Sequence, residues 1–256
     1  MAVPTSFQLN TGAHMPAVGL GTWQSKPGEV EAAVSYALQN GYKLVDTAYC
    51  YANEAEVGVG IKAALDAGVK REDIFVVSKV WPTYLTRIDL ALERSCKALG
   101  VDYIDAFLVY SKAWLEELVN NCTVVPAINQ IELHPALPQQ DVIDFCKQHG
   151  IHVMAYSPLG STANSHFQIK PIAHLAEKKG VSPATILLSY HTARGTTVLP
   201  KSVTPARIKA NLDIVHLDDE EMQLLRDYGE ELTREGKLHR VIFPPFKSSF
   251  GFPDKA

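Results

Sequence analysis

One pattern recurs along almost the whole 256-residue chain: a short apolar or β-branched run, a turn, and then an amphipathic helix. A strand that is followed by a helical crossover leads into a second, parallel strand. Seven such strands are predicted, at residues 17–21, 43–46, 74–79, 103–109, 127–133, 152–157 and 197–201. The recurrence therefore predicts an α/β fold built on a parallel sheet.

The segments between the strands show helical periodicity. Val30, Ala33, Val34 and Ala37 recur at intervals of three and four residues, and Gly41 follows as a stop signal. Residues 7–10 and 14–16 precede the first strand and form a predicted hairpin. The expected helices cover residues 26–40, 53–67, 85–99, 113–120, 139–149, 171–179, 183–193, 204–212 and 218–231.

Eight strand–helix units close a (β/α)8 barrel of the TIM-barrel type, for which about 250 residues is the usual length. Only seven strands can be counted here, and helix 113–120 follows strand 103–109 almost directly. We therefore expect one domain over residues 1–256, a barrel that lacks one helix–strand unit. Adjacent prolines at 244 and 245 predict an extended C-terminal tail over residues 233–256.

Composition excludes several classes of protein. With 46% apolar residues the chain can bury a core, and a net charge of -4 without basic runs argues against nucleic acid as a partner. No stretch approaches the roughly 18 apolar residues of a membrane span, and the first ten residues lack a secretory pattern. The four cysteines form no CxxC pair, so neither a zinc site nor a disulfide framework is expected. We expect a cytoplasmic protein.

Active sites of parallel barrels form beyond the carboxyl ends of the strands. Asp46 and Lys79 end neighbouring predicted strands, and Tyr51 follows the first of them. A nearby cation lowers the pKa of a phenol from about 10, which would make Tyr51 a proton donor for carbonyl reduction. Asp46 and Lys79 also fit a structural ion pair at the rim, with Tyr51 covering an apolar edge.

Two further groups of residues fit a nucleotide cofactor. Lys201, Ser202, Thr204 and Arg207 surround a predicted helix start, where cations, hydroxyls and free amides would hold the phosphate of NADPH. A solvated helix start with Thr204 as N-cap explains the same stretch. Tyr156 could stack on a nicotinamide ring while Asn129 and Gln130 bind its carboxamide, or it could be an aromatic plug in the barrel.

Six motifs together resemble the aldo-keto reductases, especially the fungal aldose reductase, xylose reductase or glycerol dehydrogenase-like members. They occur in the family's order over nearly the entire chain: GLGTW from Gly19, DTAYCYANEAEVG from Asp46, VSKVW from Val77, NQIELHP from Asn129, YSPLGS from Tyr156 and LPKSVTPARIKANL from Leu199. This family is a (β/α)8 barrel that uses NADPH without a Rossmann fold, which agrees with the absence of GxGxxG here.

The resemblance implies a role for each matching residue. Tyr51 corresponds to the proton donor, Asp46 and Lys79 to its supporting pair, and Trp23 and Trp81 to walls of the substrate pocket. The implied reaction is hydride transfer from NADPH to an aldehyde or ketone, either a sugar or a small aliphatic or aromatic carbonyl. The implied NADP(H) contacts are Thr22, Asn129, Gln130, Tyr156, Ser157, Leu159, Ser161, Lys201, Ser202, Thr204, Arg207 and Asn211.

The chain departs from the family after Val109. There the family continues with a histidine motif like LVHWP and later a motif like GVSNYS, whereas Val109 passes directly to Tyr110 and Ser111. About fifty residues are therefore absent, including one αβ crossover, the catalytic histidine and a Ser-Asn pair that holds the nicotinamide. No other histidine is an evident substitute; His134 is interpreted as a loop residue before Pro135.

Because this segment is absent, we expect a gap in the barrel with two exposed strand edges. We also expect weaker catalysis. The protein should be a monomer, and its exposed strand edges are the expected route to association. A skipped exon, an assembly error, a deliberate deletion or an omitted segment would each produce this junction. Two other functions remain open. One is a catalytically silent NADP(H)-binding or interaction protein, like the potassium-channel β subunits of this superfamily. The other is a phosphate-binding isomerase on an ordinary barrel.

Overall fold

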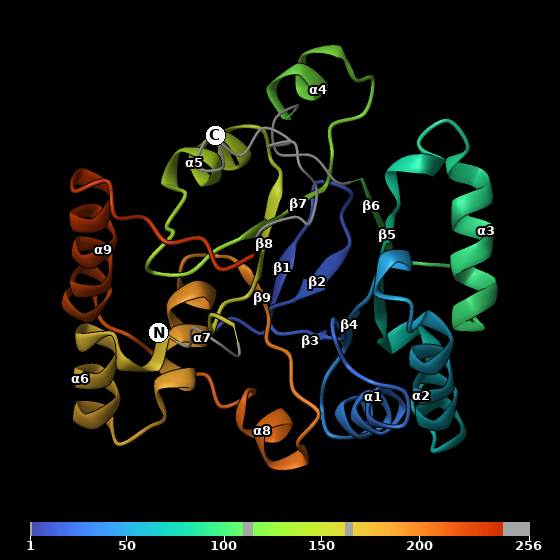
Figure 1. Ribbon diagram of the computed structural model, residues 1–256, viewed down its shortest axis with the longest axis horizontal. Helices are drawn as coiled ribbons and strands as arrows, with labels where there is room; N and C mark the ends of the chain where they lie inside the picture. Colours follow the sequence, from blue (N-terminus) through green and yellow to red (C-terminus); the bar gives the residue numbers. More distant parts are fainter. Residues whose placement is uncertain (1, 110–114, 162–165, 243–256) are drawn as a thin grey trace.

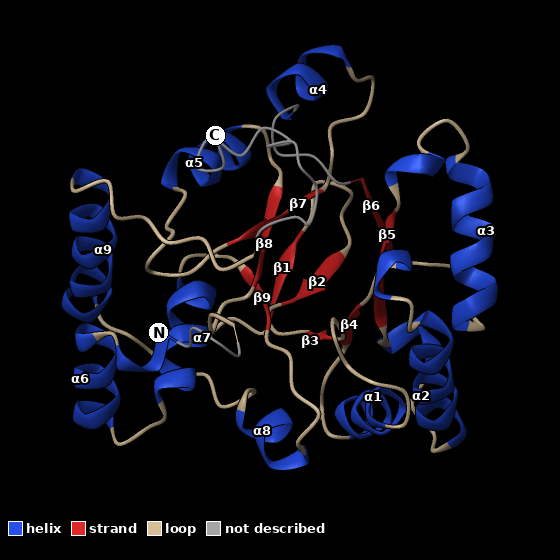
Figure 2. Cartoon of the chain, in the orientation of Figure 1, coloured by secondary structure: helices blue, strands red, loops and turns tan. Residues whose placement is uncertain are grey.

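The computed structural model describes residues 2–109, 115–161 and 166–242, with strands at the centre and helices around them (Figures 1 and 2). The N-terminal hairpin is present: β1 (Ser6–Gln8) pairs antiparallel with β2 (His14–Pro16). Met15 of this hairpin belongs to one buried apolar cluster with Leu44, Val77, Met154 and Leu199. The hairpin therefore contributes to the apolar layer inside the sheet.

All seven predicted parallel strands are present, mostly shorter than expected, and they form two ladders. The first has the order β3-β4-β5-β6 and the second β7-β8-β9. The strands are β3 (Leu20–Gly21), β4 (Leu44–Asp46), β5 (Phe75–Val80), β6 (Ala106–Val109), β7 (Ile128–Glu132), β8 (His152–Tyr156) and β9 (Thr197–Leu199).

Parallel bridges join the second ladder to the first. Val18 pairs with Val198 and Gly21 with Lys201, and the Gly19 amide donates to the Val198 carbonyl at 2.9 Å. The strands therefore form one series from β7 through β9 and β3 to β6. No pairing joins β6 to β7 among the described residues, so the barrel has a seam where the sequence predicts a missing helix–strand unit.

The nine predicted helices are also present, with ends shifted by a few residues. They are α1 (Glu29–Gln39), α2 (Glu54–Asp66), α3 (Ile88–Leu99), α4 (Leu115–Asn121), α5 (Gln140–Gln148), α6 (Lys170–Lys179), α7 (Pro183–Ala193), α8 (Pro205–Ala210) and α9 (Asp219–Arg234). In the described residues none of these helices is long and apolar enough to cross a membrane.

The predicted start of the C-terminal tail, residue 233, is wrong. Helix α9 begins with a capping box between Asp218 and Glu221 and continues to Arg234. Gly236, at φ +66°, follows its end and donates its amide to the carbonyl of Thr233 at 3.2 Å. A glycine at this position ends the helix later than the apolar pattern indicated. Residues 243–256, with both prolines, lie outside the described residues.

Two glycines let α2 approach its neighbours closely. A Cβ on Gly58 would lie 2.5 Å from the Leu99 carbonyl oxygen of α3, and one on Gly60 would lie 2.7 Å from the Glu31 carbonyl oxygen of α1. Any larger residue would push these helices apart. The packing fixes the position of α2, whose first turn follows Tyr51 in the chain.

Candidate active site

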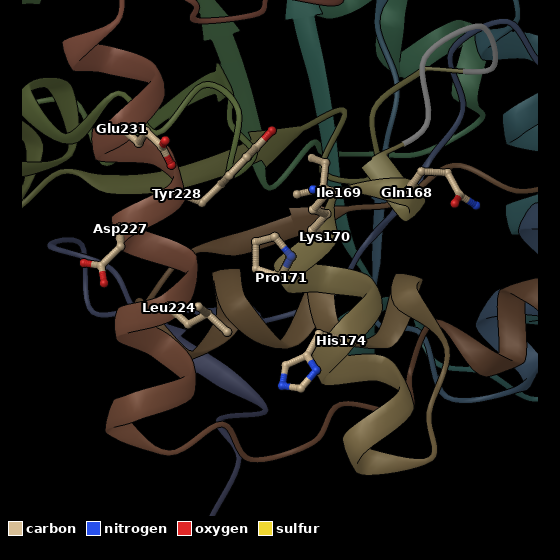
Figure 3. Close-up of a pocket in the computed structure, with 9 residues that line it drawn as sticks. All are labelled: Gln168, Ile169, Lys170, Pro171, His174, Leu224, Asp227, Tyr228 and Glu231. Atoms are coloured by element: carbon tan, nitrogen blue, oxygen red, sulfur yellow. The ribbon is translucent and has the colours of Figure 1, made fainter.

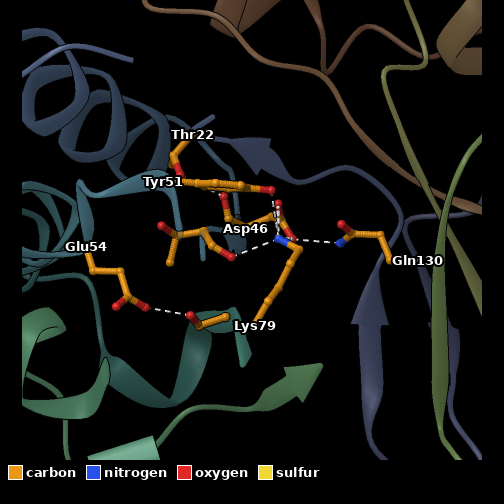
Figure 4. Close-up of polar contacts among 8 residues, drawn as sticks. Thr22, Asp46, Tyr51, Glu54, Lys79 and Gln130 are labelled. Carbon is orange, nitrogen blue, oxygen red and sulfur yellow. Dashed lines mark hydrogen bonds and ion pairs between the residues drawn. The ribbon is translucent and has the colours of Figure 1, made fainter. Parts of the chain in front are cut away.

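Asp46, Lys79 and Tyr51 meet at the carboxyl ends of β4 and β5 (Figure 4). Lys79 Nζ donates to both carboxylate oxygens of Asp46 at 2.8 and 2.9 Å and to the Thr47 carbonyl at 2.8 Å. It lies 3.1 Å from the Tyr51 hydroxyl. The Lys79 and Asp46 side chains are 3% and 5% exposed, so this ion pair is buried and its ammonium contacts a phenol.

Strand alternation explains why these side chains meet. Leu44 and Val77 belong to the apolar layer inside the sheet, whereas Val45 packs toward the helices. Successive side chains of a strand point to opposite faces, so Asp46 and Lys79 share the inner face with Leu44 and Val77. The two charged groups complete the same stack of side chains at its carboxyl end.

The turn that carries Tyr51 is held by hydrogen bonds to the preceding loop. Tyr51 lies in a short 3-10 helix, Tyr49–Tyr51, and Asn53 follows at the N-cap of α2, as predicted. The Asn53 side chain does not cap the helix; it donates to the carbonyls of Thr22 at 3.0 Å and Ser25 at 3.3 Å. Thr22 in turn donates its hydroxyl to the Asp46 carbonyl at 3.0 Å. Thr22 therefore supports the Asp46 main chain.

Glu54 is a buried member of the site that the sequence analysis missed. It accepts hydrogen bonds from Ser78 at 2.6 Å and Ser95 at 3.1 Å, and burial raises the pKa of its carboxyl. Ser78 precedes Lys79 on β5, so Glu54 ties the start of α2 to the strand that carries the lysine. An acidic residue in the first turn of a helix is common, and nothing in the local sequence marked this one as buried.

Gln130 and Asn129 point to opposite sides of β7, so the structure does not bring both to the site. Gln130 Nε2 donates to Asp46 Oδ1 at 2.7 Å (Figure 4). Asn129 Nδ2 contacts Cys146 Sγ of α5 at 3.4 Å, on the helix-facing side. The expectation that both contact the nicotinamide carboxamide needs this correction, because adjacent strand residues cannot face one ligand from the same side.

Tyr156 ends β8, and the residues expected to hold the pyrophosphate follow it directly. Ser157 has φ +52°, and its carbonyl accepts the Gly160 amide at 3.0 Å in a tight turn. The Leu159 side chain packs against two core clusters, and its carbonyl accepts the His166 amide at 3.2 Å. Ser161 is half-buried and precedes the undescribed residues 162–165.

The residues expected to bind the 2'-phosphate lie between β9 and α8. Lys201 and Arg207 are exposed, and neither forms an ion pair with a described residue. Ser202 Oγ accepts the Thr204 amide at 3.1 Å, and Thr204 is the N-cap of α8 without a side-chain cap. Pro205 begins the helix, as predicted. The two unpaired cations at a helix start fit a phosphate.

Asn211 has a different environment from the other expected phosphate contacts. It is buried at the end of α8 and hydrogen bonds to the Tyr42 side chain, whose hydroxyl also donates to the Ile208 carbonyl at 3.1 Å. Burial raises the pKa of Tyr42. Asn211 therefore also contributes to the contact between α8 and the segment after α1.

The two tryptophans expected in the substrate pocket follow β3 and β5. Trp23 is 41% exposed, and Trp81 is half-buried at the start of the 3-10 helix Pro82–Tyr84. Tyr110 and Ser111, which follow Val109 where the family continues with its histidine motif, lie outside the described residues. His134 is not a substitute, since it is fully buried, hydrogen bonds to Glu132 at 3.0 Å and packs against His166, with the two rings tilted by 45°.

A separate hollow of about 880 Å³ lies between α6 and α9, on the outer layer of the molecule (Figure 3). It contains none of the residues expected from the sequence. Its lining includes charged side chains of both signs and apolar side chains, and we assign it no role. The lining residues are Gln168, Ile169, Lys170, Pro171, His174, Leu224, Asp227, Tyr228 and Glu231.

The model of the aldo/keto reductase family matches residues 17–119 and 110–230 of this chain. The chain belongs to the aldo/keto reductase family. The family match also sets aside the isomerase interpretation. The two matched stretches meet at residues 110–119, where the sequence predicts the junction.

Named relatives of this aldo-keto reductase include fungal enzymes. It is 53% identical to a D-galacturonate reductase of Hypocrea jecorina, over 99% of this chain and 100% of that protein. It is 37% identical to a glycerol 2-dehydrogenase (NADP(+)) of Saccharomyces cerevisiae, over 91% of this chain and 93% of the relative. The first alignment spans 308 positions, 52 more than the 256 residues here, so at least 52 positions of that relative have no counterpart in this chain.

Solved structures agree with the family assignment. An aldo-keto reductase of Bombyx mori in complex with NADP is 30% identical, with a TM-score of 0.84 over 95% of this chain and 96% of that one. An aldose reductase from Schistosoma japonicum is 29% identical, with a TM-score of 0.85 over 98% of this chain and 99% of that one. This aldo-keto reductase is therefore an oxidoreductase with the family's α/β fold.

Proposed function

We propose that this aldo-keto reductase uses NADPH to reduce aldehydes or ketones to alcohols, with Tyr51 as the proton donor. The cofactor supplies a hydride to the carbonyl carbon. Tyr51 gives its hydroxyl proton to the carbonyl oxygen and regains a proton from solvent, so the products are an alcohol and NADP(+). The observation that carries the proposal is the 3.1 Å contact between Lys79 Nζ and the Tyr51 hydroxyl.

Lys79 stabilises the negative charge that forms on the Tyr51 oxygen when the proton leaves. Asp46 holds the ammonium through two hydrogen bonds and keeps it directed at the phenol. Because both charged groups are buried, water screens their effect on Tyr51 only weakly. These contacts favour a proton-donating role over a merely structural ion pair.

The residues present fit NADPH. Lys201 and Arg207 would neutralise the 2'-phosphate, Tyr156 would stack on the nicotinamide, and Gln130 would orient its carboxamide through the amide oxygen. A relative is named as NADP(+)-dependent and a related structure contains NADP, which supports the same cofactor here. We propose weaker activity than in a complete relative, because the family's histidine and Ser-Asn pair are absent.

Sugars and small aliphatic or aromatic carbonyls are the proposed substrates. The name of the 53% identical relative makes D-galacturonate the first compound to assay.

We also propose that the enzyme is cytoplasmic, because all four cysteines are free thiols. We expect a monomer, with the β6 and β7 edges as the route to association.

The test replaces Tyr51 by Phe, which keeps the ring and removes the proton. We expect NADPH oxidation with an aldehyde to fall at least about a hundredfold, while NADPH binding by fluorescence titration is unchanged. Tyr49→Phe, in the same 3-10 helix, is the matched control and should keep activity. Full activity in Tyr51→Phe would refute the mechanism. NADPH binding without turnover in the unaltered chain would instead identify a silent binding protein.

A further inference from the structure

Glu132, at the carboxyl end of β7, is a buried carboxylate that the proposed reaction does not use. Its side chain is 0% exposed. A buried carboxylate is costly unless several donors satisfy it, so its partners indicate its role. Here the partners come mainly from a segment more than a hundred residues further along the chain.

The partners of Glu132 are consecutive residues that follow α9. The Val241 amide donates to Oε1 at 2.7 Å, and the Ile242 amide donates to Oε2 at 3.1 Å. The Arg240 guanidinium lies 3.6 Å from Oε2, and the His239 amide donates to the Ala136 carbonyl at 3.0 Å. Each of residues 239–242 therefore contacts either β7 or the loop that follows it.

The charge of Glu132 is balanced within this contact. His134 Nε2 lies 3.0 Å from Oε1, and burial lowers the pKa of His134, which favours the neutral imidazole. Arg240 is then the cation that faces the carboxylate. Charge-assisted hydrogen bonds to backbone amides are stronger than neutral ones, which makes Glu132 an effective attachment point for the segment.

The attachment lies close to the candidate active site. Ile128 belongs to the apolar inner layer, so Gln130 and Glu132 follow it on the inner face of β7. Gln130 contacts Asp46 at 2.7 Å. Same-face neighbours on a strand are about 7 Å apart, so residues 239–242 are attached one step beyond the residue that touches the Asp46 carboxylate, toward the open end of the strands.

We infer that Glu132 is a positioning residue, which acts by fixing residues 239–242 as a wall of the carbonyl-binding site. This inference rests on the proposed function. The wall orders the site for substrate without contacting the Tyr51 proton, so its loss should weaken substrate binding and leave the chemical step unchanged.

Hydrogen exchange on the full chain tests the attachment directly. Glu132→Gln keeps the side-chain volume but replaces one acceptor oxygen by a donor group. The amides of Val241 and Ile242 should exchange about tenfold faster or more, with exchange in β4 and β5 unchanged. Asp105→Asn is a matched control, since Asp105 also accepts a backbone amide, that of Val76 at 2.8 Å, before β6. It should leave residues 241 and 242 protected.

Steady-state kinetics test the effect on the site. Glu132→Gln should raise the KM for an aldehyde about threefold or more, with kcat and NADPH affinity unchanged. Val241→Pro removes one donor without touching the carboxylate and should reproduce the change, which keeps the test valid if Glu132→Gln does not fold. Unchanged exchange in Glu132→Gln, or unchanged KM in both variants, would overturn the inference. Loss of the Tyr51 mechanism would leave the exchange result standing, so the two failures are distinguishable.

Discussion

Gln130 Nε2 lies 2.7 Å from Asp46 Oδ1, although 84 positions separate the two residues. Asp46 belongs to the ladder β3 to β6 and Gln130 to the ladder β7 to β9. In the part of the chain that the structure describes, the two ladders are not paired between β6 and β7, but they are joined at their other edges, between β9 and β3. The two halves of the site therefore stay together.

Replacing Gln130 by Glu should disturb the buried ion pair. A second carboxylate beside Asp46 would compete for the Lys79 ammonium and weaken its contact with Tyr51. We expect aldehyde reduction to fall about tenfold, with little change in the melting temperature. Gln140→Glu adds the same charge on α5, beside Arg194, and should not alter turnover. Equal turnover in both variants would contradict the role given to the Asp46–Lys79 pair.

Arg207 should determine the preference for NADPH over NADH. Arg207→Ala is expected to weaken NADPH binding about tenfold and to leave NADH binding unchanged, since only NADPH carries the 2'-phosphate. Lys209→Ala, two positions further along α8, is the control and should change neither affinity. Fluorescence titration measures both cofactors. A parallel loss of NADPH and NADH affinity in Arg207→Ala would disprove a 2'-phosphate contact.

Stability should fall in acid because buried histidines resist protonation. Burial lowers the pKa of His166 to about 3 and of His152 to about 4, below the usual value of 6.5. Between pH 6.5 and these lowered pKa values, the unfolded chain binds more protons than the folded chain. The free energy of unfolding therefore decreases as the pH falls from about 6.5. Each such histidine contributes a slope of about 1.4 kcal/mol per pH unit.

Melting temperatures at pH 7 and pH 5 measure this effect. His166→Leu removes one buried proton acceptor, so its melting temperature should fall less between the two pH values. His14 is an exposed residue in β2. His14→Leu should show the same fall in melting temperature between pH 7 and pH 5 as the unaltered protein. If the melting temperature of His166→Leu falls between pH 7 and pH 5 by as much as that of the unaltered protein, His166 does not titrate as described.

Insertion of the family segment after Val109 should raise both stability and turnover. An added strand would pair with the β6 and β7 edges, and the inserted histidine would help to polarise the carbonyl. A second inserted form with that histidine changed to Ala separates the effects. Both forms should melt at a higher temperature, and only the form with histidine should regain high turnover. If the 256-residue chain already matches the restored form, the junction does no damage.

The sequence alone was sufficient to predict the seven parallel strands, the nine helices and the seam. These depend on local apolar periodicity and on the order of motifs, which can be read without knowing any partner. The approach of Asp46, Lys79 and Tyr51 was also predictable, because neighbouring parallel strands bring their carboxyl ends together.

Only the tertiary structure decided which faces and which distant partners these residues have. Asn129 and Gln130 are adjacent and chemically alike, but the packing of Ile128 inside the sheet sends Gln130 to Asp46 and Asn129 to Cys146. Glu54 and Glu132 looked like ordinary acidic residues until their buried partners were known. A side chain's burial and hydrogen bonds depend on segments far away in the chain, and local propensity carries no record of them.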